Sequence, residues 1–440
     1  MPVTPVFPAD MHIALYTQIF PGMIQPLEFT GWQDESMARK NSCYIGAPLS
    51  PPATTYVKGP DAIKFLSDVT THSYANFAVG RARHTVITDE DGLVIAHGVV
   101  IRTAEDVVKT YFLSPDLNYM ATKGSWDIEL EPHFGDRFLI QMAGPRCLEL
   151  IEQATQENFH DLKFMGYRES SVDGMPVEVL RMGMGGTLSY EFHGAMNDAP
   201  KIYSKLLEVG EPLGVRNIGW ATYMAQHTES GFQQVEVHFI SASAKDKDMP
   251  AFLHSIGLAG FHNTARFVGS SGPDINKRLR NPLELGFGKA VSFDHEFPGR
   301  AALQREVENP TRKTVTLTWN TEDLIDVFAS YFQRGEEPYR FIDFPAERLA
   351  GAISHQDDVL DTDGNLVGYS SGRQYSLMSR DIFSLGVIDV DKVEMGTELH
   401  VLWGEPGTRQ KLIRATVSKV PHLEMTMNWD YDVSNIPRLT

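Results

Sequence analysis

A single carboxylate, Glu191, follows a glycine-rich stretch at residues 181–187 and lies in a strand-like run at 188–194. A buried carboxylate needs hydrogen-bond donors to compensate for the loss of water. A flat nitrogen heterocycle with an amine and a ring N–H offers two such donors in one plane. Glu191 falls on the more polar face of its run, so a solvated strand residue is the competing interpretation. The pattern leaves a ligand anchor and a surface residue equally open.

A tyrosine, Tyr223, follows in the next helical segment. Its hydroxyl is a weak acid, with a pKa of about 10, and can donate a proton to a leaving group of similar basicity. The competing interpretation is a core residue whose ring fills space and whose hydroxyl reaches a backbone carbonyl. Spacing along the chain leaves both roles open.

Signatures of other chemistries are missing from the sequence. The 15 histidines form no pair at zinc-type spacing, and Cys43 and Cys147 lie too far apart for a metal or redox motif. The glycines at 183–186 lack the lysine and hydroxyl residue of a phosphate loop, so we assign them to a tight hairpin. No Gly-x-Ser-x-Gly motif occurs. We therefore predict no metal site.

Composition limits the class of partner. The chain has 440 residues, 42% of them hydrophobic and 22% charged, which is typical of a globular protein with more than one domain. Its formal charge of −18 disfavours nucleic acid and anionic membranes, both of which favour a basic surface. No apolar run reaches the ~20 residues that span a bilayer, and the first residues do not resemble a signal peptide. We predict a cytoplasmic protein that binds neither nucleic acid nor a membrane.

Two stretches of the chain share one order of elements. In the first, a strand precedes a Gly-Pro helix start at 59–69, and a hairpin follows around the Asp-Gly turn at 91–92. In the second, a strand at 138–142 precedes another Gly-Pro helix start at 144–152, and more strands and a helix follow. The echo between the two Gly-Pro segments indicates a duplicated α+β unit.

The remaining segments differ in character. Residues 1–50, rich in proline, glycine and aromatics, predict an irregular arm that packs across a domain, and residues 240–280 predict a loop. From about residue 310, short strands separated by turns predict a small β-barrel or sandwich. We therefore divide the chain into residues 1–309, two α+β units with the arm, and a C-terminal β-barrel domain, 310–440.

Several short segments occur in an order that resembles the glycine-cleavage T-protein (aminomethyltransferase) superfamily. These segments are Val57–Ala62, Asp91–Val94, Gly144–Pro145, Leu188–Phe192, Glu229–Phe232, Asn281–Gly288 and Phe297–Leu303. Residues 313–320, 375–379 and 396–405 look closer still to one branch, the tetrahydrofolate-dependent O-demethylases of the lignin-derived compounds vanillate, 3-O-methylgallate and syringate. The resemblance extends from about Trp32 to Val420 and rests on the order and spacing of these motifs.

The resemblance implies a cloverleaf of two α+β folate-binding units plus a C-terminal β-barrel, with tetrahydrofolate in a central channel. Residues 1–309 would then form the folate-binding catalytic region. By the same resemblance, Glu191 matches the carboxylate that holds the pterin edge, and Phe232 matches an aromatic position beside the folate. Tyr223 matches the catalytic tyrosine of the O-demethylase branch.

Departures from the family concern the other half of the site. His97 stands where aminomethyltransferases carry an aspartate near the reactive folate nitrogen, which argues against glycine cleavage. A histidine there can act as a proton relay or a substrate contact, and a strand histidine packed under the sheet is the alternative. Residues 47–52 and the stretch near Ser114 lack the Gln, His and Arg that would meet an aromatic acid. We therefore expect a substrate other than vanillate, either without the carboxylate or bulkier.

We predict an enzyme that moves a methyl group from a methoxylated aromatic compound to N5 of tetrahydrofolate. Because a phenoxide is a poor leaving group, Tyr223 is expected to protonate the ether oxygen as the bond breaks. Tyr16, with Gln18 and Phe20, is a candidate lid residue that contacts the substrate. Two alternatives keep the folate: a demethylase of a sulfonium or amine donor, and a folate-binding protein without transferase activity.

Overall fold

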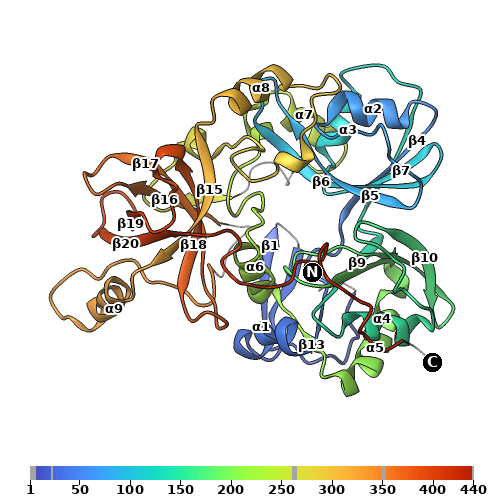
Figure 1. The fold of residues 1–440 in the computed structure, drawn as a ribbon, viewed down its shortest axis with the longest axis horizontal. Coiled ribbons are helices and arrows are strands. Elements are labelled where there is room, and N and C mark those ends of the chain that lie inside the picture. Colours follow the sequence, from blue (N-terminus) through green and yellow to red (C-terminus); the bar gives the residue numbers. More distant parts are fainter. Residues whose placement is uncertain (1–5, 21–22, 260–264, 348–352, 439–440) are drawn as a thin grey trace.

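The computed structural model describes residues 6–20, 23–259, 265–347 and 353–438. The chain forms three lobes around the central helix α6 (Trp220–Glu229), as Figure 1 shows. Two lobes are mixed units of strands and helices, and the third is a β-barrel. The predicted α+β class and the cloverleaf are confirmed.

The first α+β unit is a five-stranded sheet with the order β5-β6-β7-β4-β8. Its elements are β4 (Ala53–Lys58), α2 (Ala62–Val69), β5 (Arg81–Thr88), β6 (Val94–Ala104), β7 (Val107–Tyr111), α3 (Asp116–Ala121) and β8 (Glu129–Phe134). Phe65, Leu66 and Val69 lie on one face of α2 at helical spacing and are buried in the core of this unit. Burial of this face fixes α2 against the sheet.

The second unit repeats this arrangement in a six-stranded sheet with the order β10-β11-β12-β9-β3-β13. Its elements are β3 (Tyr44–Gly46), β9 (Arg137–Ala143), α4 (Cys147–Thr155), β10 (Tyr167–Val172), β11 (Met175–Leu180), β12 (Ser189–Ala195), α5 (Ala199–Gly210) and β13 (Arg216–Asn217). The first four strands have the order of the first unit, with β10, β11, β12 and β9 in the places of β5, β6, β7 and β4. The shared topology supports the predicted duplication.

Backbone geometry explains the repeated Gly-Pro helix starts. Gly59 has φ +124° and Gly144 has φ +132°, which non-glycine residues rarely adopt. A Cβ at Gly59 would lie 2.5 Å from the Asp127 carbonyl oxygen, and one at Gly144 would lie 2.4 Å from the Ser42 carbonyl oxygen. Each glycine lets a strand turn sharply into its helix while a second chain segment passes against it.

The N-terminal segment is more regular than the predicted irregular arm, so that prediction is wrong for the described residues. β1 (Leu15–Phe20) and β2 (Met23–Glu28) form a two-stranded sheet, and α1 (Trp32–Asn41) follows. β3 then pairs with β9 and β13, far away in sequence. Such long-range pairing leaves no local pattern in a three-residue strand.

The predicted loop at 240–280 also contains short elements. They are α7 (Met249–Ser255), β14 (Arg266–Val268) and the 3-10 helices η3 (Ala242–Lys245) and η5 (Ile275–Arg278). Residues 260–264 lie outside the described residues. The other described 3-10 helices are η1 (Met196–Asp198), η2 (Glu211–Leu213), η6 (Gly288–Ala290), η7 (Ser330–Phe332) and η8 (Val390–Lys392). Among the described residues, no helix is both long and apolar enough to cross a bilayer.

The third lobe follows α8 (Arg300–Glu308) and is a β-barrel with α9 (Thr321–Ala329) inserted after its first strand. Its strands are β15 (Arg312–Trp319), β16 (Ile353–Leu360), β17 (Leu366–Tyr375), β18 (Ile382–Asp389), β19 (Glu398–Trp403) and β20 (Lys411–Ser418). A pairing between β16 and β19 closes the barrel, and β14 adds a parallel strand beside β16. After Ser418 the chain leaves the barrel, and Arg181 of the second unit bonds to Asn428 and Tyr431. The division at residue 309 remains a prediction.

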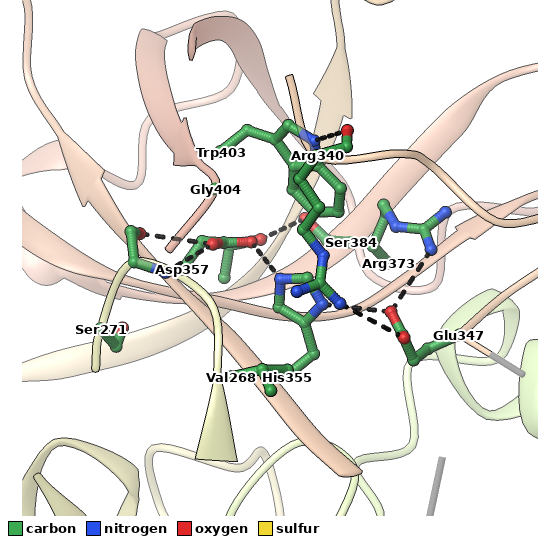
Figure 2. A network of polar contacts seen from close by, with 12 residues as sticks. Val268, Ser271, Arg340, Glu347, His355, Asp357, Arg373, Ser384, Trp403 and Gly404 are labelled. Atoms are coloured by element: carbon green, nitrogen blue, oxygen red, sulfur yellow. Dashed lines mark hydrogen bonds and ion pairs between the residues drawn. The ribbon is translucent and has the colours of Figure 1, made fainter. Parts of the chain in front are cut away.

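A buried network of charged side chains lies at β16 and β17 of the barrel (Figure 2). His355 Nδ1 lies 3.2 Å from Glu347 Oε2, and His355 Nε2 lies 2.9 Å from Asp357 Oδ2. Glu347 also faces Arg340 and Arg373, at N–O distances of 3.4 and 3.9 Å. Burial alone would lower the pKa of His355, but the two carboxylates outweigh burial and raise that pKa above 6.5.

Replacing His355 with glutamine should flatten the dependence of stability on pH. Because the pKa of His355 is raised in the folded state, its protonation stabilises the fold fully below about pH 6.5, and this contribution is lost as the pH rises through the folded-state pKa. Thermal unfolding between about pH 6 and 9 should show a steeper loss of stability in the wild-type protein than in His355→Gln. Parallel curves would contradict the assigned protonation.

Candidate functional site

A cavity of about 340 Å³ is lined by both α+β units, by α6 and by the segments that follow α6. Its lining is mostly apolar, and its polar side chains are His84, His97, Ser114, Asp116, Gln141, Glu191, Tyr223, His227, Gln234, Glu236, Ser241 and Ser243. In the described part of the chain, no arginine or lysine lines the cavity. Four of the predicted site residues, Glu191, Tyr223, His97 and Phe232, therefore meet in one place.

Glu191 is buried on β12, so the interpretation as a solvated strand residue is wrong. Its Oε1 accepts a hydrogen bond from Gln141 Nε2 at 2.9 Å, and its Oε2 lies 3.0 Å from His193 Nε2. Gln141 is the residue directly opposite Glu191 in the β9–β12 ladder. The buried Oε1 of Gln141 has no partner among the described residues. Glu191 and Gln141 thus present hydrogen-bond acceptors side by side on the cavity wall.

Tyr223 lies on α6, almost fully buried. Its Oη is buried and has no hydrogen-bond partner among the described residues, which excludes the predicted alternative of a bond to a backbone carbonyl there. Burial raises the pKa of Tyr223 well above 10, and the nearby Tyr44 and Glu191 raise it further. Tyr223 is therefore protonated at neutral pH and has a free donor at the cavity.

His97 on β6 forms a pair with His84 on β5. Nδ1 of His97 lies 3.2 Å from Nε2 of His84, and the buried Nε2 of His97 has no partner in the described chain. Burial lowers the pKa of His97 well below 6.5 and that of His84 to about 4, so both rings are neutral at pH 7. His97 lines the cavity, and whether it acts as a proton relay, a substrate contact or a packing residue stays a prediction.

Phe232 follows α6 and packs against a group of aromatic rings. Its ring centroid lies 5.5 Å from that of His84, 5.6 Å from that of His97 and 5.1 Å from that of Phe287. This arrangement gives the cavity a flat apolar wall beside the two histidines, which suits an aromatic or heterocyclic ligand.

The glycine-rich stretch forms a turn that leads into β12 and covers one side of the cavity. A Cβ at Gly185 would lie 2.7 Å from the Ala143 side chain, and Gly186 has φ +68°. Met182 and Met184, in the same stretch, line the cavity. The glycines allow close backbone packing. The connection between β11 and β12 runs over residues 181–188, however, so the predicted tight hairpin is wrong and the segment is a longer loop.

Helix α1 holds α6 at both of its ends. At the start of α6, Glu35 Oε2 accepts hydrogen bonds from the Gly219 N–H at 2.8 Å and from Thr222 Oγ1 at 3.1 Å. At the other end, buried Arg39 forms an ion pair with Glu229, and Arg39 Nη1 donates to the Gly185 carbonyl at 3.0 Å. Both Tyr223 and the turn before Glu191 are therefore positioned by α1.

The structure does not bring Tyr16 to the cavity. Tyr16 lies on β1, its side chain is 48% exposed, and it is not among the lining residues. Gln18 is also exposed, and the side chain of Phe20 lies outside the described residues. The lid role of these residues stays a prediction.

Several polar residues of the cavity escaped the sequence prediction, among them His84, Gln141, His227, Asp116 and Glu236. His227 lies one turn after Tyr223 on α6, with a ring centroid separation of 4.8 Å, and neither of its ring nitrogens has a partner among the described residues. Burial raises the pKa of Asp116 and of Glu236 to about 7. The i,i+4 spacing from Tyr223 is a signal that could have located His227. For Asp116 and Glu236 the sequence has no comparable signal.

No metal-ligating cluster of three or more His, Cys, Asp or Glu side chains occurs among the described residues. Cys43 and Cys147 are buried free thiols. The arrangement of the cavity is that of a site for organic ligands.

Comparison with known proteins shows the family. Residues 12–242 match the family profile described as the GCVT N-terminal domain, which is more than half of the chain. The chain belongs to the GCVT (aminomethyltransferase) family. It is 41% identical to sesamin methylene transferase of Sinomonas sp., over 94% of this chain and 93% of that protein. It is 28% identical to syringate O-demethylase of Sphingobium sp., over 92% and 90% of the two chains.

The fold agrees with this assignment. The crystal structure of glycine cleavage system aminomethyltransferase T from Bartonella henselae superposes with a TM-score of 0.68 at 17% sequence identity, covering 93% of this chain and 94% of that one. The predicted superfamily is thereby confirmed. This chain is a tetrahydrofolate-dependent transferase of that family.

The cavity fits the pterin of tetrahydrofolate. A pterin edge carries an amine and ring N–H groups, and Glu191 with the unpartnered Oε1 of Gln141 offers acceptors for such donors. Both acceptors are buried, so each lacks compensation from water. The roles that the family resemblance implies, Glu191 at the pterin edge and Phe232 beside the folate, stay predictions that this geometry permits.

Replacing Glu191 with glutamine should weaken the binding of tetrahydrofolate roughly tenfold to a hundredfold, because a hydrogen bond to a charged group contributes about 1.5–3 kcal/mol. Titration calorimetry measures this affinity directly. Glu169→Gln, at an exposed position of the same sheet, is the matched control and should bind as the wild type does. Equal affinity in both variants would remove Glu191 from the folate site.

Replacing Glu229 with glutamine should lower the free energy of unfolding by about 3 kcal/mol, since it leaves Arg39 buried without its counter-charge. The matched control is Asp34→Asn, which removes the half-exposed Arg216–Asp34 pair and should lower stability by less than about 1 kcal/mol. Urea denaturation of both variants tests the comparison. A loss as small for Glu229→Gln as for the control would show that α1 does not hold α6 through this pair.

Proposed function

We propose that this protein transfers a methyl group from the ether oxygen of an uncharged methoxylated aromatic compound to N5 of tetrahydrofolate, with Tyr223 as the acid. One observation supports this most directly: the buried Oη of Tyr223 has no partner among the described residues and lines the same cavity as Glu191. A cytoplasmic location and a role in the breakdown of lignin-derived aromatics belong to the same proposal, as does the absence of nucleic-acid and membrane partners.

Tyr223 provides the proton that the leaving group needs. When bound, tetrahydrofolate supplies a nucleophilic amine, N5, which accepts the carbon. As the carbon–oxygen bond breaks, Tyr223 Oη donates its proton to the ether oxygen, and a phenol leaves. The conjugate acid of a phenoxide has a pKa of about 10 in water. Burial raises the pKa of Tyr223 above that value, and the same apolar cavity disfavours a departing phenoxide, so the tyrosine keeps its proton until charge develops on the ether oxygen. One C–N bond forms, one C–O bond breaks, and no oxidant or reductant is needed.

His97 is the residue we assign to the return of that proton. The N–H proton of the nucleophilic amine must reach the tyrosinate for Tyr223 to act again. His97 is neutral, so its unpartnered Nε2 can accept a proton. The hydrogen bond between Nδ1 of His97 and Nε2 of His84 determines which nitrogen of His97 carries the proton. The aromatic wall around the pair excludes water from this transfer.

The walls of the cavity favour a substrate without a carboxylate. No arginine or lysine lines the cavity in the described chain, whereas three carboxyl groups do. Pro48, Leu49 and Pro51 line the cavity with apolar side chains. They belong to the segment 47–52, which lacks the Gln, His and Arg that would meet an aromatic acid. An aromatic carboxylate would lose its hydration here without gaining a counter-charge. An uncharged ether avoids that cost.

A second candidate differs in the one-carbon group that is moved. The relative at 41% identity is named a methylene transferase of sesamin, whereas the relative at 28% is named an O-demethylase of syringate. A methylenedioxy bridge would release both of its oxygens as a catechol, and its carbon would bond to two folate nitrogens. The similarity favours this reaction, and the folate product distinguishes it from methyl transfer.

The two earlier alternatives receive less support. A sulfonium is already a good leaving group and does not need the acid Tyr223. A folate-binding protein without activity does not need an unpartnered acid at the cavity.

The experiment that separates all of these candidate functions incubates the protein with tetrahydrofolate and a panel of donors. The panel contains neutral methoxy and methylenedioxy arenes, syringate and a sulfonium, and mass spectrometry identifies the folate product. Turnover of syringate in preference to the neutral ethers would contradict an uncharged substrate.

Replacing Tyr223 with phenylalanine should lower kcat about 10²–10⁴-fold, which is the usual contribution of general acid catalysis. The ring that packs against His227 remains, so the melting temperature and the affinity for tetrahydrofolate should stay close to the wild-type values. The variant should regain activity with a donor whose leaving group is a weak base, such as a nitrophenyl methyl ether. A variant with unchanged turnover on an unactivated ether would rule out Tyr223 as the acid.

A further inference from the structure

Glu236 is a half-buried residue whose carboxyl group the transfer described above does not use. It lies in the segment that follows α6 and lines the cavity. Its Oε2 is buried and has no hydrogen-bond partner among the described residues. A buried acceptor that is left unpaired destabilises the protein. A ligand that brings a donor would remove this destabilisation.

The backbone of Glu236 is also strained. Its φ of +66° lies in the left-handed region that non-glycine residues rarely adopt. An isolated bridge between Val235 and Phe239 and a 2.6 Å bond from the Glu236 N–H to the Phe239 carbonyl hold this conformation. Glycine would adopt it without strain. Backbone strain of this kind gathers at functional sites, where the surrounding structure maintains it.

Unlike Glu191, Glu236 has no hydrogen-bond donor within the described protein for its buried carboxyl oxygen. The carboxylate of Glu191 forms hydrogen bonds with the side chains of Gln141 and His193. The Oε2 atom of Glu236 has no hydrogen-bond donor, from a side chain or from the backbone, among the described residues. No arginine or lysine of the described cavity wall can supply a charge. Burial raises the pKa of Glu236 to about 7, with no other contribution. The donor for Oε2 must therefore come from the cavity, which a bound ligand or water fills.

We propose that Glu236 accepts a hydrogen bond from a phenolic hydroxyl of the aromatic ligand, the group that forms when the ether oxygen loses its carbon. The inference rests on the proposed function, because transfer of a carbon from an aryl ether oxygen, as a methyl or as a methylene group, turns an ether without donors into a phenol with one. When ionised, Glu236 has no proton to donate to an ether oxygen, so it favours hydroxylated ligands, namely the phenol product and substrates with a free hydroxyl, over fully alkylated ethers. The binding contrast is therefore measured at about pH 8, above the pKa of about 7 that burial gives this carboxyl group. Folate N–H groups are the other donors that could reach the cavity.

Equilibrium binding tests this discrimination without turnover. The ligands are catechol, which has two donors, 1,2-methylenedioxybenzene, which has none, and tetrahydrofolate. Glu236→Gln should bind catechol about tenfold more weakly than the wild type and methylenedioxybenzene within about twofold. Its affinity for tetrahydrofolate should be unchanged. Asp116→Asn is the comparison variant, because the buried Oδ1 of Asp116 also lacks a partner among the described residues and Asp116 lines the same cavity. It should retain the affinity for catechol, and a loss of that affinity in Asp116→Asn but not in Glu236→Gln would overturn the assignment to Glu236.

A glycine variant separates function from stability. Glu236→Gly removes both the strained side chain and the unpaired carboxyl group, so its unfolding midpoint should rise by about 1–2 °C while its affinity for catechol falls as in Glu236→Gln. Gln156→Gly is the matched control, because Gln156 has φ +59° at the exposed end of α4. It should also raise the midpoint, but without changing the affinity for catechol.

Three further outcomes would overturn the inference. Equal losses of affinity for catechol and methylenedioxybenzene would show a role in shape alone. A loss of affinity for tetrahydrofolate with catechol unaffected would place the donor on the folate. Unchanged affinity for all three ligands would remove Glu236 from binding. Failure of the proposed function looks different, since wild-type protein would then bind neither aromatic compound nor transfer a carbon from any ether in the panel.

Discussion

The buried contacts between α1 and α6 support the whole candidate site. Glu35 bonds to the start of α6, and Arg39 forms an ion pair with Glu229 at its end. Arg39 also binds the Gly185 carbonyl in the turn that leads to β12. The same short helix therefore sets the position of the acid on α6 and of the pterin anchor on β12. Because the charges are buried, neither contact can be loosened without a large loss of stability.

Burial also decides the protonation of the cavity. It raises the pKa of Tyr223 and of Glu236, and it lowers the pKa of His97. Each of these shifts favours the uncharged form of the group. The cavity thus combines a protonated Tyr223 and a neutral His97 with apolar walls, a setting in which hydrogen bonds to a developing phenoxide are stronger than in water. A cavity of this kind suits ethers that carry no charge.

Two parts of the fold were accessible from local sequence, and one was not. The duplicated unit was visible because Gly59 and Gly144 each occupy a turn that only glycine tolerates, next to a proline and an amphipathic helix. The barrel was visible because short strands alternate with turns. The N-terminal elements were missed, since the three residues of β3 form a strand only by pairing with β9 and β13. Long-range partners of this kind have no local signature.

The sequence by itself determined the family and the candidates Glu191, Tyr223, His97 and Phe232, because their types and order are properties of the chain. It could not decide between a solvated and a buried Glu191, or between a core and a cavity role for Tyr223. Only the tertiary structure decided these questions, through burial and unpaired polar atoms that depend on contacts between distant segments. The same contacts placed His227, Asp116 and Glu236 in the cavity. The types and order of the candidate residues are thus read from the sequence, whereas their burial and their neighbours in the cavity depend on the packing of distant segments.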